Sequence, residues 1–355
     1  MQRALHPLPS TLEIPLKAFR QYSLILLALV VVSWIVIPLR YQVAYPREIK
    51  PQFDKYIRRK YVEQMDARHP DIVMLGDSML RPAINETVLS QKLNRKILTI
   101  GLPGSASTLW YLIVKNNIIE AKVPPKVLVI VFRDTMMTVP GYRVTGRYFE
   151  QIDEFAGPKD EELVKKAYLN QMNPLEKLAE GYFPPFGSRW NIRQGVDSRI
   201  RYTMPNLGLG CDPTCMNNSM EIVFGDANMD VNFLSDALAA ADDYLYSKTA
   251  LDFDQQVGES FLPDLIKLCQ DHGIQLILVR MRILRFALPG SEPPGLETYN
   301  DGLRAYLAAN GVIYFDYSGE SRLGRDQFSD PLHINPNGQA IFTEIFANDL
   351  LPYVK

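Results

Sequence analysis

The sequence predicts an α/β fold with a mostly parallel sheet, preceded by a transmembrane helix and interrupted by a long irregular insertion. Two observations predict the sheet: short apolar runs end at glycines or polar residues, and helical patterns separate several of these runs. The third observation is an uncharged apolar stretch, Ser23–Leu39, which is near the minimum length of a membrane span, roughly 17 residues. We therefore expect an anchored globular domain.

The composition is that of an ordinary globular protein. The chain has 355 residues, of which 47% are hydrophobic and 22% charged, so it can bury a sizeable core. Its formal net charge of -2 gives no indication of a nucleic-acid partner, and we expect none. The sequence also has no metal-ligand cluster, phosphate-binding glycine loop or nucleotide fingerprint, so no cofactor is expected.

The N-terminal region divides into a tail (residues 1–20), a transmembrane helix (21–39) and a charged stalk (40–68) with helical character over Phe53–Ala67. Trp34 and Tyr41 suit the aromatic belt of a membrane interface. A buried core helix or a cleaved signal peptide are the alternatives. Because Pro38–Tyr41 is a poor cleavage site, the sequence favours an uncleaved single-pass anchor.

The orientation of this anchor is predicted differently by two arguments. Positive charges flank its N-terminal side at Arg3, Lys17 and Arg20, and its C-terminal side at Arg40, Arg47, Lys50, Lys55, Arg58 and Arg59. The positive-inside rule then favours a cytoplasmic body. A disulfide in the body would favour the opposite side. We expect the body to be extracytoplasmic, against the charge count.

The body, residues 69–355, contains the α/β pattern. The expected strands are 71–75, 96–100, 127–132, 274–279 and 312–315. The expected helices are 108–120, 261–272, 299–309 and 338–351. Such sheets place their functional sites beyond the carboxyl ends of the strands.

An insertion from about 137 to 258 breaks this rhythm, with a helix expected over Asp236–Tyr246. Its aromatic residues can stack on sugars or pack in a core; they are Tyr182, Phe183, Phe186 and Trp190.

Three cysteines bear on the compartment of the body. Cys211 and Cys215 flank a short loop that contains Pro213, which favours a disulfide between them over two free thiols. A metal site is the further alternative, but no other Cys or His lies nearby in the sequence. Cys269 falls in a helical pattern and is expected in the core.

Gly76-Asp77-Ser78-Met79 directly follows the first expected strand. Gly76 permits a tight exit from the strand, and Ser78 then lies near the start of a helix, where free N–H groups can bind an oxyanion. The motif alone is also typical of a simple helix cap.

Asp330-Pro331-Leu332-His333 precedes the last expected helix. Of the four histidines, only His333 lies in a loop with an Asp three residues earlier, a spacing that lets the carboxylate hold the imidazole. In isolation such a pair is more typical of a loop hydrogen bond than of a catalytic site.

Together the two motifs resemble the GDSL or SGNH hydrolase superfamily, over roughly residues 70–135 and 270–355. The resemblance implies a three-layer α/β/α, flavodoxin-like sandwich with Ser78 as nucleophile and Asp330 and His333 completing a catalytic triad. It also implies an oxyanion hole that uses the backbone N–H groups of Ser78 and Gly104.

The third block of the family departs from its pattern here. The family has Gly-x-Asn-Asp after the third strand, and the Asn side chain donates to the oxyanion. This chain has Arg133-Asp134-Thr135 instead, so Thr135 or Arg133 is the candidate replacement donor. Loss of one such donor typically costs about 2.7–4 kcal/mol of transition-state stabilisation, so activity is expected to be weak if nothing replaces it.

The anchor and the altered third block are similar to those of membrane-tethered SGNH proteins that act beside membrane-bound O-acyltransferases, in alginate (exopolysaccharide) acetylation or lipoteichoic-acid D-alanylation. The resemblance implies an esterase or O-acyltransferase that acts on an acylated polysaccharide or another cell-envelope polymer, with the membrane and a membrane-bound O-acyltransferase as partners. The alternatives are a low-turnover polysaccharide-binding accessory and a lipid esterase.

Overall fold

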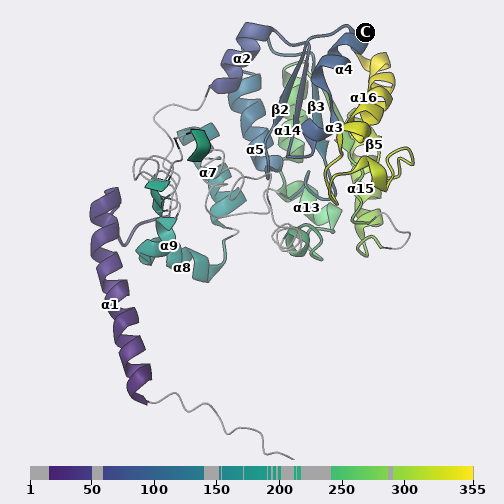
Figure 1. Cartoon of the computed structure of the whole chain (residues 1–355). Helices are drawn as coiled ribbons and strands as arrows, with labels where there is room; N and C mark the ends of the chain where they lie inside the picture. Colours follow the sequence, from purple (N-terminus) through teal and green to yellow (C-terminus); the bar gives the residue numbers. More distant parts are fainter. Residues whose placement is uncertain are drawn as a thin grey trace, which may run out of the picture. The chain divides into compact units, whose positions relative to one another are not determined.

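The computed structural model describes residues 16–49, 59–139, 154–170, 172–189, 241–286 and 291–354, with residues 152, 191–192, 195–196, 199–200, 212 and 214–216 (Figure 1). The chain forms two compact units. Unit 1 comprises Met1–Ile49 and Asn173–Met220, and unit 2 comprises Lys50–Met172 and Glu221–Lys355. The predicted insertion is therefore divided between the two units.

Unit 2 is built on a five-stranded sheet in which every neighbouring pair of strands is parallel. The strands are β1 (Ile72–Gly76), β2 (Ile97–Gly101), β3 (Val127–Phe132), β4 (Gln275–Arg280) and β5 (Ile313–Asp316). Their order, β2-β1-β3-β4-β5, is the flavodoxin-like order of doubly wound sheets. The predicted fold class is confirmed, and each predicted strand is present with its ends shifted by no more than one residue.

Two hydrophobic clusters cover the two faces of this sheet. Because side chains alternate along a strand, Val73 and Leu75 of β1 belong to one cluster, and Ile72 and Met74 to the other. The first cluster includes side chains of α2, α5, α14 and α15, and the second those of α3, α4 and α16. The molecule therefore has three layers in this unit, which leaves the strand ends as the polar edge of the sheet.

The helical elements of unit 2 are α2 (Lys60–Arg68), α3 (Leu80–Ala83), α4 (Glu86–Leu93), α5 (Ser107–Ile113), η1 (Val114–Ile118), η2 (Pro158–Asp160), α7 (Glu161–Val164), η3 (Lys165–Leu169), α13 (Phe253–Glu259), α14 (Leu262–Asp271), α15 (Leu296–Ala309), η6 (Arg325–Gln327), α16 (Pro336–Leu350) and η7 (Leu351–Tyr353).

Two ends of these helices differ from the sequence prediction for identifiable reasons. The last helix begins at Pro336, two residues before the predicted start, because Asn335 caps it through bonds from the N–H groups of Asn337 and Gly338. In the predicted stalk, α2 buries Tyr61 and Met65 against the sheet. The α2 part of the stalk is thus in the globular core, while residues 50–58 lie outside the described residues.

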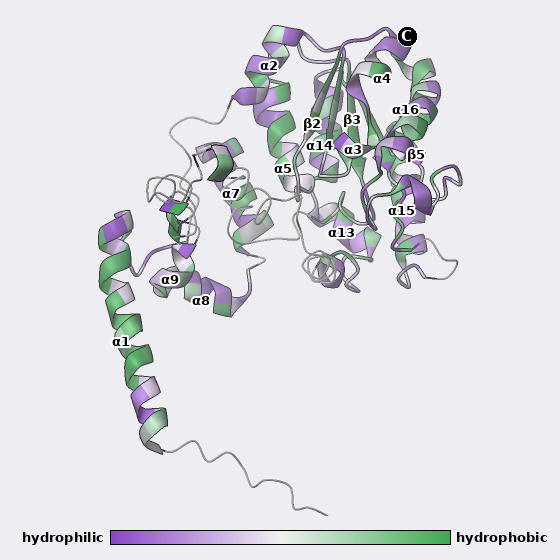
Figure 2. Cartoon of the chain, viewed as in Figure 1, coloured by the Kyte–Doolittle hydropathy of each residue, from purple (hydrophilic) through white to green (hydrophobic). Residues whose placement is uncertain are grey.

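Unit 1 contains α1 (Leu16–Tyr41), α8 (Pro174–Tyr182) and α9 (Pro184–Gly187). Within α1, Ala18–Tyr41 is long and apolar enough to cross a membrane, and it alone meets that criterion among the described residues. Figure 2 shows α1 coloured as hydrophobic over most of its length. The predicted span, 21–39, lies inside this helix, which by length and composition is a candidate anchor or signal sequence.

Candidate active site

The sequence motifs meet at the carboxyl edge of the sheet. In the sheet, β2 lies on one side of β1, and β3, β4 and β5 follow in order on the other side. The direction of winding therefore reverses between β1 and β3. In doubly wound sheets such a switch point is the usual place for a ligand. Ser78 follows β1 directly, Gly104 follows β2 and Arg133 follows β3. Asp330 and His333 lie in the segment between β5 and α16.

Ser78 lies in a sharp turn between β1 and α3. Gly76 is required at the strand end, since a Cβ there would come within 2.8 Å of the Val131 carbonyl oxygen. Asp77 closes the turn by accepting a hydrogen bond from the N–H of Met79, at 2.9 Å. Burial raises the pKa of the Asp77 carboxyl, and the Met79 N–H and the charge of Arg133 oppose this shift. The turn leaves the Ser78 side chain partly exposed at the sheet edge.

The loop that carries His333 is held by its own hydrogen bonds. One oxygen of Asp330 accepts from the backbone N–H groups of Leu332 and His333, at 2.8 and 2.9 Å. The Ser329 N–H donates to the His333 carbonyl, and Phe328 pairs with Ile334 in an antiparallel bridge. These bonds leave the second Asp330 oxygen directed at the imidazole.

Ser78, His333 and Asp330 form a continuous hydrogen-bonded chain. The His333 Nε2 lies 2.8 Å from the Ser78 Oγ, and the His333 Nδ1 lies 2.7 Å from an Asp330 carboxylate oxygen. Burial lowers the pKa of His333, but the hydrogen bond and charge of Asp330, together with Asp77, outweigh it and raise the pKa. Burial alone would raise the pKa of Asp330, but the hydrogen bonds from the His333 ring and two backbone N–H groups outweigh burial and lower this pKa. Asp330 therefore stays ionised beside the imidazole.

The loop after β2 lies against the Ser78 turn. The Leu102 N–H donates to the Gly76 carbonyl at 2.9 Å, which joins the ends of β1 and β2. Gly104 has a φ of 74°, in the left-handed region that favours glycine. In the described part of the chain, neither the Ser78 N–H nor the Gly104 N–H donates to another protein group. Both donors remain available to a bound oxygen.

The block after β3 is a buried charged cluster. Arg133 donates to the Asp134 carboxylate at 2.9 Å, and both side chains are only 3% exposed. Tyr246 donates to the same carboxylate oxygen at 2.5 Å. Asp134 itself has a φ of 50°, an uncommon conformation for a residue other than glycine. Arg133 is close enough to the triad for its charge to oppose the raised pKa of His333.

The Thr135 hydroxyl already donates a hydrogen bond to the protein backbone. The acceptor is the Leu245 carbonyl, at 2.6 Å, and Thr135 is fully buried. Because a hydroxyl has one hydrogen to donate, the Thr135 side chain cannot also donate to an oxyanion in this arrangement. Of the two residues proposed to replace the Asn of the third block, Arg133 remains the candidate oxyanion donor.

Residues that the sequence reasoning missed complete the cluster. Arg280, the last residue of β4, lies 3.9 Å from Asp134 and 3.5 Å from Asp316 at the end of β5. Tyr246 comes from the end of the insertion, on a helical stretch described from residue 241. An arginine at the end of an otherwise apolar strand was a usable sequence signal for Arg280; nothing in the sequence pairs Tyr246 with Asp134.

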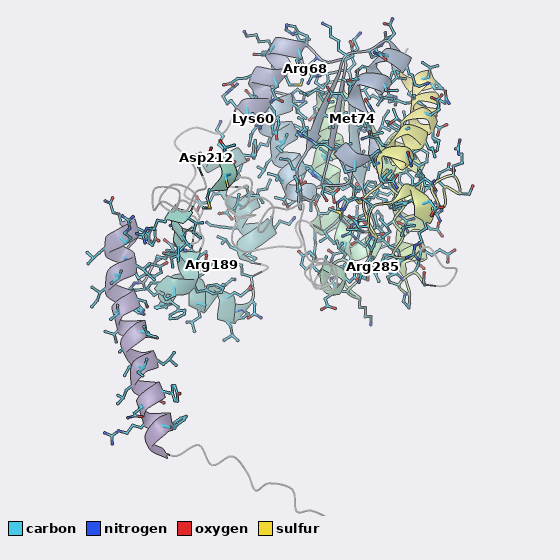
Figure 3. The ribbon with its side chains drawn as sticks, in the orientation of Figure 1. Lys60, Arg68, Met74, Arg189, Asp212 and Arg285 are labelled. Carbon is cyan, nitrogen blue, oxygen red and sulfur yellow. The ribbon has the colours of Figure 1, made fainter. Side chains whose placement is uncertain are left out.

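The insertion end and the loop after β4 are connected beside the site. Arg285, labelled in Figure 3, forms an ion pair with Asp242, and the Tyr246 and Phe286 rings meet edge to face. The Leu284 N–H donates to the Pro331 carbonyl at 2.9 Å, which ties this loop to the His333 segment. One side of the site is thus bordered by residues far apart in the sequence.

The remaining predicted residues lie elsewhere. Cys215 is disulfide-bonded, whereas its predicted partner Cys211 lies outside the described residues. Cys269 is a buried free thiol in α14, as expected. The aromatic residues Tyr182, Phe183 and Phe186 belong to unit 1, and Trp190 lies outside the described residues. Among the residues that the structure describes, no cluster of histidine, cysteine or carboxylate side chains could hold a metal.

Comparisons with known proteins find similarity only among solved structures. No protein-family model and no curated protein matches the chain. An acylhydrolase from Bacteroides fragilis aligns at 13% identity over 85% of this chain and 99% of that one, with a TM-score of 0.40. A GDSL-like lipase from Bacteroides thetaiotaomicron aligns at 12% identity over 79% of this chain and 88% of that one, with a TM-score of 0.36. A lipase/acylhydrolase from Enterococcus faecalis aligns at 12% identity over 80% and 96%, with a TM-score of 0.32. These three structures are described as acylhydrolases and lipases.

Proposed function

We propose that the chain is a membrane-anchored serine esterase or O-acyltransferase of the GDSL/SGNH type. The observation that carries this proposal is the unbroken chain of hydrogen bonds from Ser78 through His333 to Asp330, at 2.8 and 2.7 Å. A serine hydroxyl is a weak nucleophile until a base takes its proton, and the base must be held in the right tautomer. These three residues supply the nucleophile, the base and the group that holds the base.

The reaction proceeds through an acyl-enzyme. His333, neutral at the start, takes the proton of Ser78 while the Ser78 Oγ attacks the acyl carbonyl, and Asp330 stabilises the resulting imidazolium. The oxyanion is bound by the N–H groups of Ser78 and Gly104. The imidazolium then protonates the leaving alcohol. In the second half, His333 activates water or a sugar hydroxyl, which takes the acyl group from Ser78.

Arg133 takes the place of the Asn that the family uses after the third strand. It is held by Asp134, and its charge reaches the triad. A guanidinium beside the acyl carbonyl would stabilise developing negative charge and offset the missing amide donor. This proposal assigns Arg133 a role that depends on charge, which distinguishes it from the neutral donor of the family.

The substrate class rests on the proposed anchoring of the chain by α1 together with the resemblance to membrane-tethered SGNH proteins. We propose an acylated polysaccharide or another cell-envelope polymer on the extracytoplasmic side, with a membrane-bound O-acyltransferase as partner. The Cys215 disulfide supports an oxidising compartment. A lipid esterase is the second candidate, favoured by the same apolar helix.

The test is turnover of a small acyl ester by the detergent-solubilised full chain, with Ser78→Ala alongside. The proposal predicts acyl release by the wild type, loss of release in the variant, and covalent labelling of Ser78 by a fluorophosphonate. Equal activity of both proteins would overturn it.

Acetyl transfer to an added oligosaccharide distinguishes a transferase from an esterase, and fatty-acid release from phospholipid vesicles identifies a lipid esterase. Polysaccharide binding that persists in Ser78→Ala, without turnover by either protein, would instead support the non-catalytic accessory.

A further inference from the structure

Helix α8 in unit 1 presents its apolar side outward. Leu175, Leu178, Tyr182 and Phe183 have the i, i+3, i+7, i+8 spacing of one helix face. Their exposed fractions are 74%, 59%, 56% and 39%. A soluble domain normally turns such a face toward its core, and an exposed one marks an interaction site. Figure 2 shows hydrophilic and hydrophobic residues together on α8, whereas α1 is hydrophobic over most of its length.

The polar side of the same helix is turned toward the rest of unit 1. The Glu180 carboxylate, only 15% exposed, pairs with Arg47 and with Arg189, which Figure 3 labels. Arg47 also donates to the Gly187 carbonyl at 2.7 Å. The Glu180 charge is therefore satisfied inside the unit, and the apolar residues of α8 are the ones left exposed to a partner. A helix with its polar side turned inward and its apolar side exposed is expected when its partner is apolar.

The unit also places α8 relative to the end of α1. Gln42 has a φ of 55°, which ends α1 and reverses the chain. The returning segment brings Tyr45 to Trp34, with ring centroids 6.4 Å apart, so it lies along the last two turns of α1. Tyr45 bonds to Ser188 at 3.0 Å, and Arg47 binds Gly187 and the end of α8. The end of α8 and α9 are thus held near the level of the last turns of α1.

Those last turns lie at the edge of a bilayer if α1 spans it. The 26 residues of α1 extend about 39 Å, whereas the hydrocarbon core is about 30 Å thick. The excess belongs to the headgroup region, and Trp34 and Tyr41 are residues of the kind enriched there. A helix fixed beside these turns with an outward apolar face meets lipid at the boundary between headgroups and acyl chains.

We propose that α8 is an interfacial helix whose Leu175–Phe183 face inserts into the same bilayer that α1 spans. The chain is then attached at two points, a spanning helix and an in-plane helix, which fixes the rotation and tilt of unit 1 at the membrane. The proposal rests on the proposed anchoring by α1, and it is independent of the chemistry at Ser78. It assigns Tyr182 and Phe183 to lipid rather than to sugar.

The test uses depth-dependent quenching in the full chain, reconstituted into vesicles of phosphatidylethanolamine and phosphatidylglycerol. A polarity-sensitive fluorophore is attached to Leu178→Cys on the apolar face, to Lys177→Cys on the opposite face as the matched control, and to Val31→Cys within α1. The unsubstituted chain, treated identically, supplies the labelling background. Spin-labelled lipids then report contact, with the label either near the headgroup or at the chain end.

The expected result is blue-shifted emission at Leu178→Cys that is quenched more strongly by headgroup-level labels than by chain-end labels. Lys177→Cys should be quenched by neither lipid label, and Val31→Cys should be quenched most by chain-end labels. Water-like, unquenched emission at Leu178→Cys would overturn the proposal. Blue-shifted but unquenched emission there would also overturn it, because protein would then cover the face: another part of the chain, a second copy or a membrane-protein partner. An unquenched Val31→Cys would remove the anchor and the interfacial helix together, while esterase activity that depends on Ser78 would leave the proposed chemistry standing.

Discussion

The two sides of the candidate site are held by different kinds of interaction. On one side, Ser78, His333 and Asp330 are partly exposed; Asp330 and His333 share one self-supporting loop, and Ser78 comes from the turn after β1. On the other, Arg133 and Asp134 are almost fully buried, and their supports come from the insertion and from β4. On the first side, each of the two motifs is shaped by its own local bonds, and one tertiary bond, from His333 to Ser78, joins them. The second side is defined by tertiary contacts.

The difference has energetic consequences. Removing a triad member changes chemistry and leaves few buried groups without partners. Removing a member of the Arg133–Asp134 pair leaves a buried charge, which typically costs about 3–5 kcal/mol. We therefore expect variants of the first side to lose activity with little loss of stability, and variants of the second to lose both.

The largest effect is expected from Ser78→Ala. Loss of a nucleophile in such triads lowers kcat by about 10⁶-fold, because no other group forms the acyl-enzyme. Thermal unfolding should be nearly unchanged, since among the described residues the Ser78 hydroxyl bonds to the His333 imidazole alone. Ester turnover and unfolding are measured together. Ser329→Ala, in the His333 loop, is the control and should keep most of its turnover; a Ser78→Ala protein that keeps its rate would exclude Ser78 as the nucleophile.

Asp330→Asn comes next, with a loss of about 10⁴-fold in kcat from the wrong imidazole tautomer. Its diagnostic feature is the pH profile of kcat/KM. The working base is neutral His333, and Asp330 raises the His333 pKa, so removing this carboxylate lowers that pKa. The acidic limb of the profile should therefore move to lower pH. An acidic limb that stays in place would mean that Asp330 does not hold the imidazole.

Arg133→Met should lower kcat by about 10²–10³-fold, the typical cost of one oxyanion donor. Because this change also leaves Asp134 buried without its closest cation, the double variant Arg133→Met/Asp134→Asn is needed to restore stability. The double variant should recover stability, because neither charge of the pair is then left buried alone, but its kcat should stay low. Recovery of full kcat together with stability would show that Arg133 has a structural role alone. Arg322→Met, which removes an exposed arginine paired with Glu320, is the control.

The smallest effect is expected from Tyr246→Phe. The change removes one hydrogen bond to the buried Asp134 carboxylate, and a bond to a charged group is worth about 1.5–3 kcal/mol. Urea unfolding should detect this loss of stability, while kcat changes by less than it does in Arg133→Met. A large fall in kcat with unchanged stability would place Tyr246 in contact with the substrate instead.

Much of the fold could be predicted because its signals are local. The strands appear as apolar runs, and the helices as periodic patterns, so both are visible within about ten residues of sequence. The helix ends were less accurate where capping decided them, as at Asn335 and Pro336. The insertion was predicted as one region, yet contacts of Arg47 with Glu180 and Gly187 assign part of it to the unit of α1. Such long-range pairings have no local signature.

The sequence by itself determined the α/β class, the apolar N-terminal helix and the three residues proposed for the triad, because each depends on spacing along the chain. Only the tertiary structure decided that Thr135 bonds to Leu245 while Arg133 shares a buried cluster with Asp134 and Tyr246. It also decided that α8 turns Glu180 inward and its leucines outward. The physical reason is the same in both cases: the free energy of a polar or apolar side chain depends on what surrounds it, and folding brings those surroundings from distant parts of the sequence.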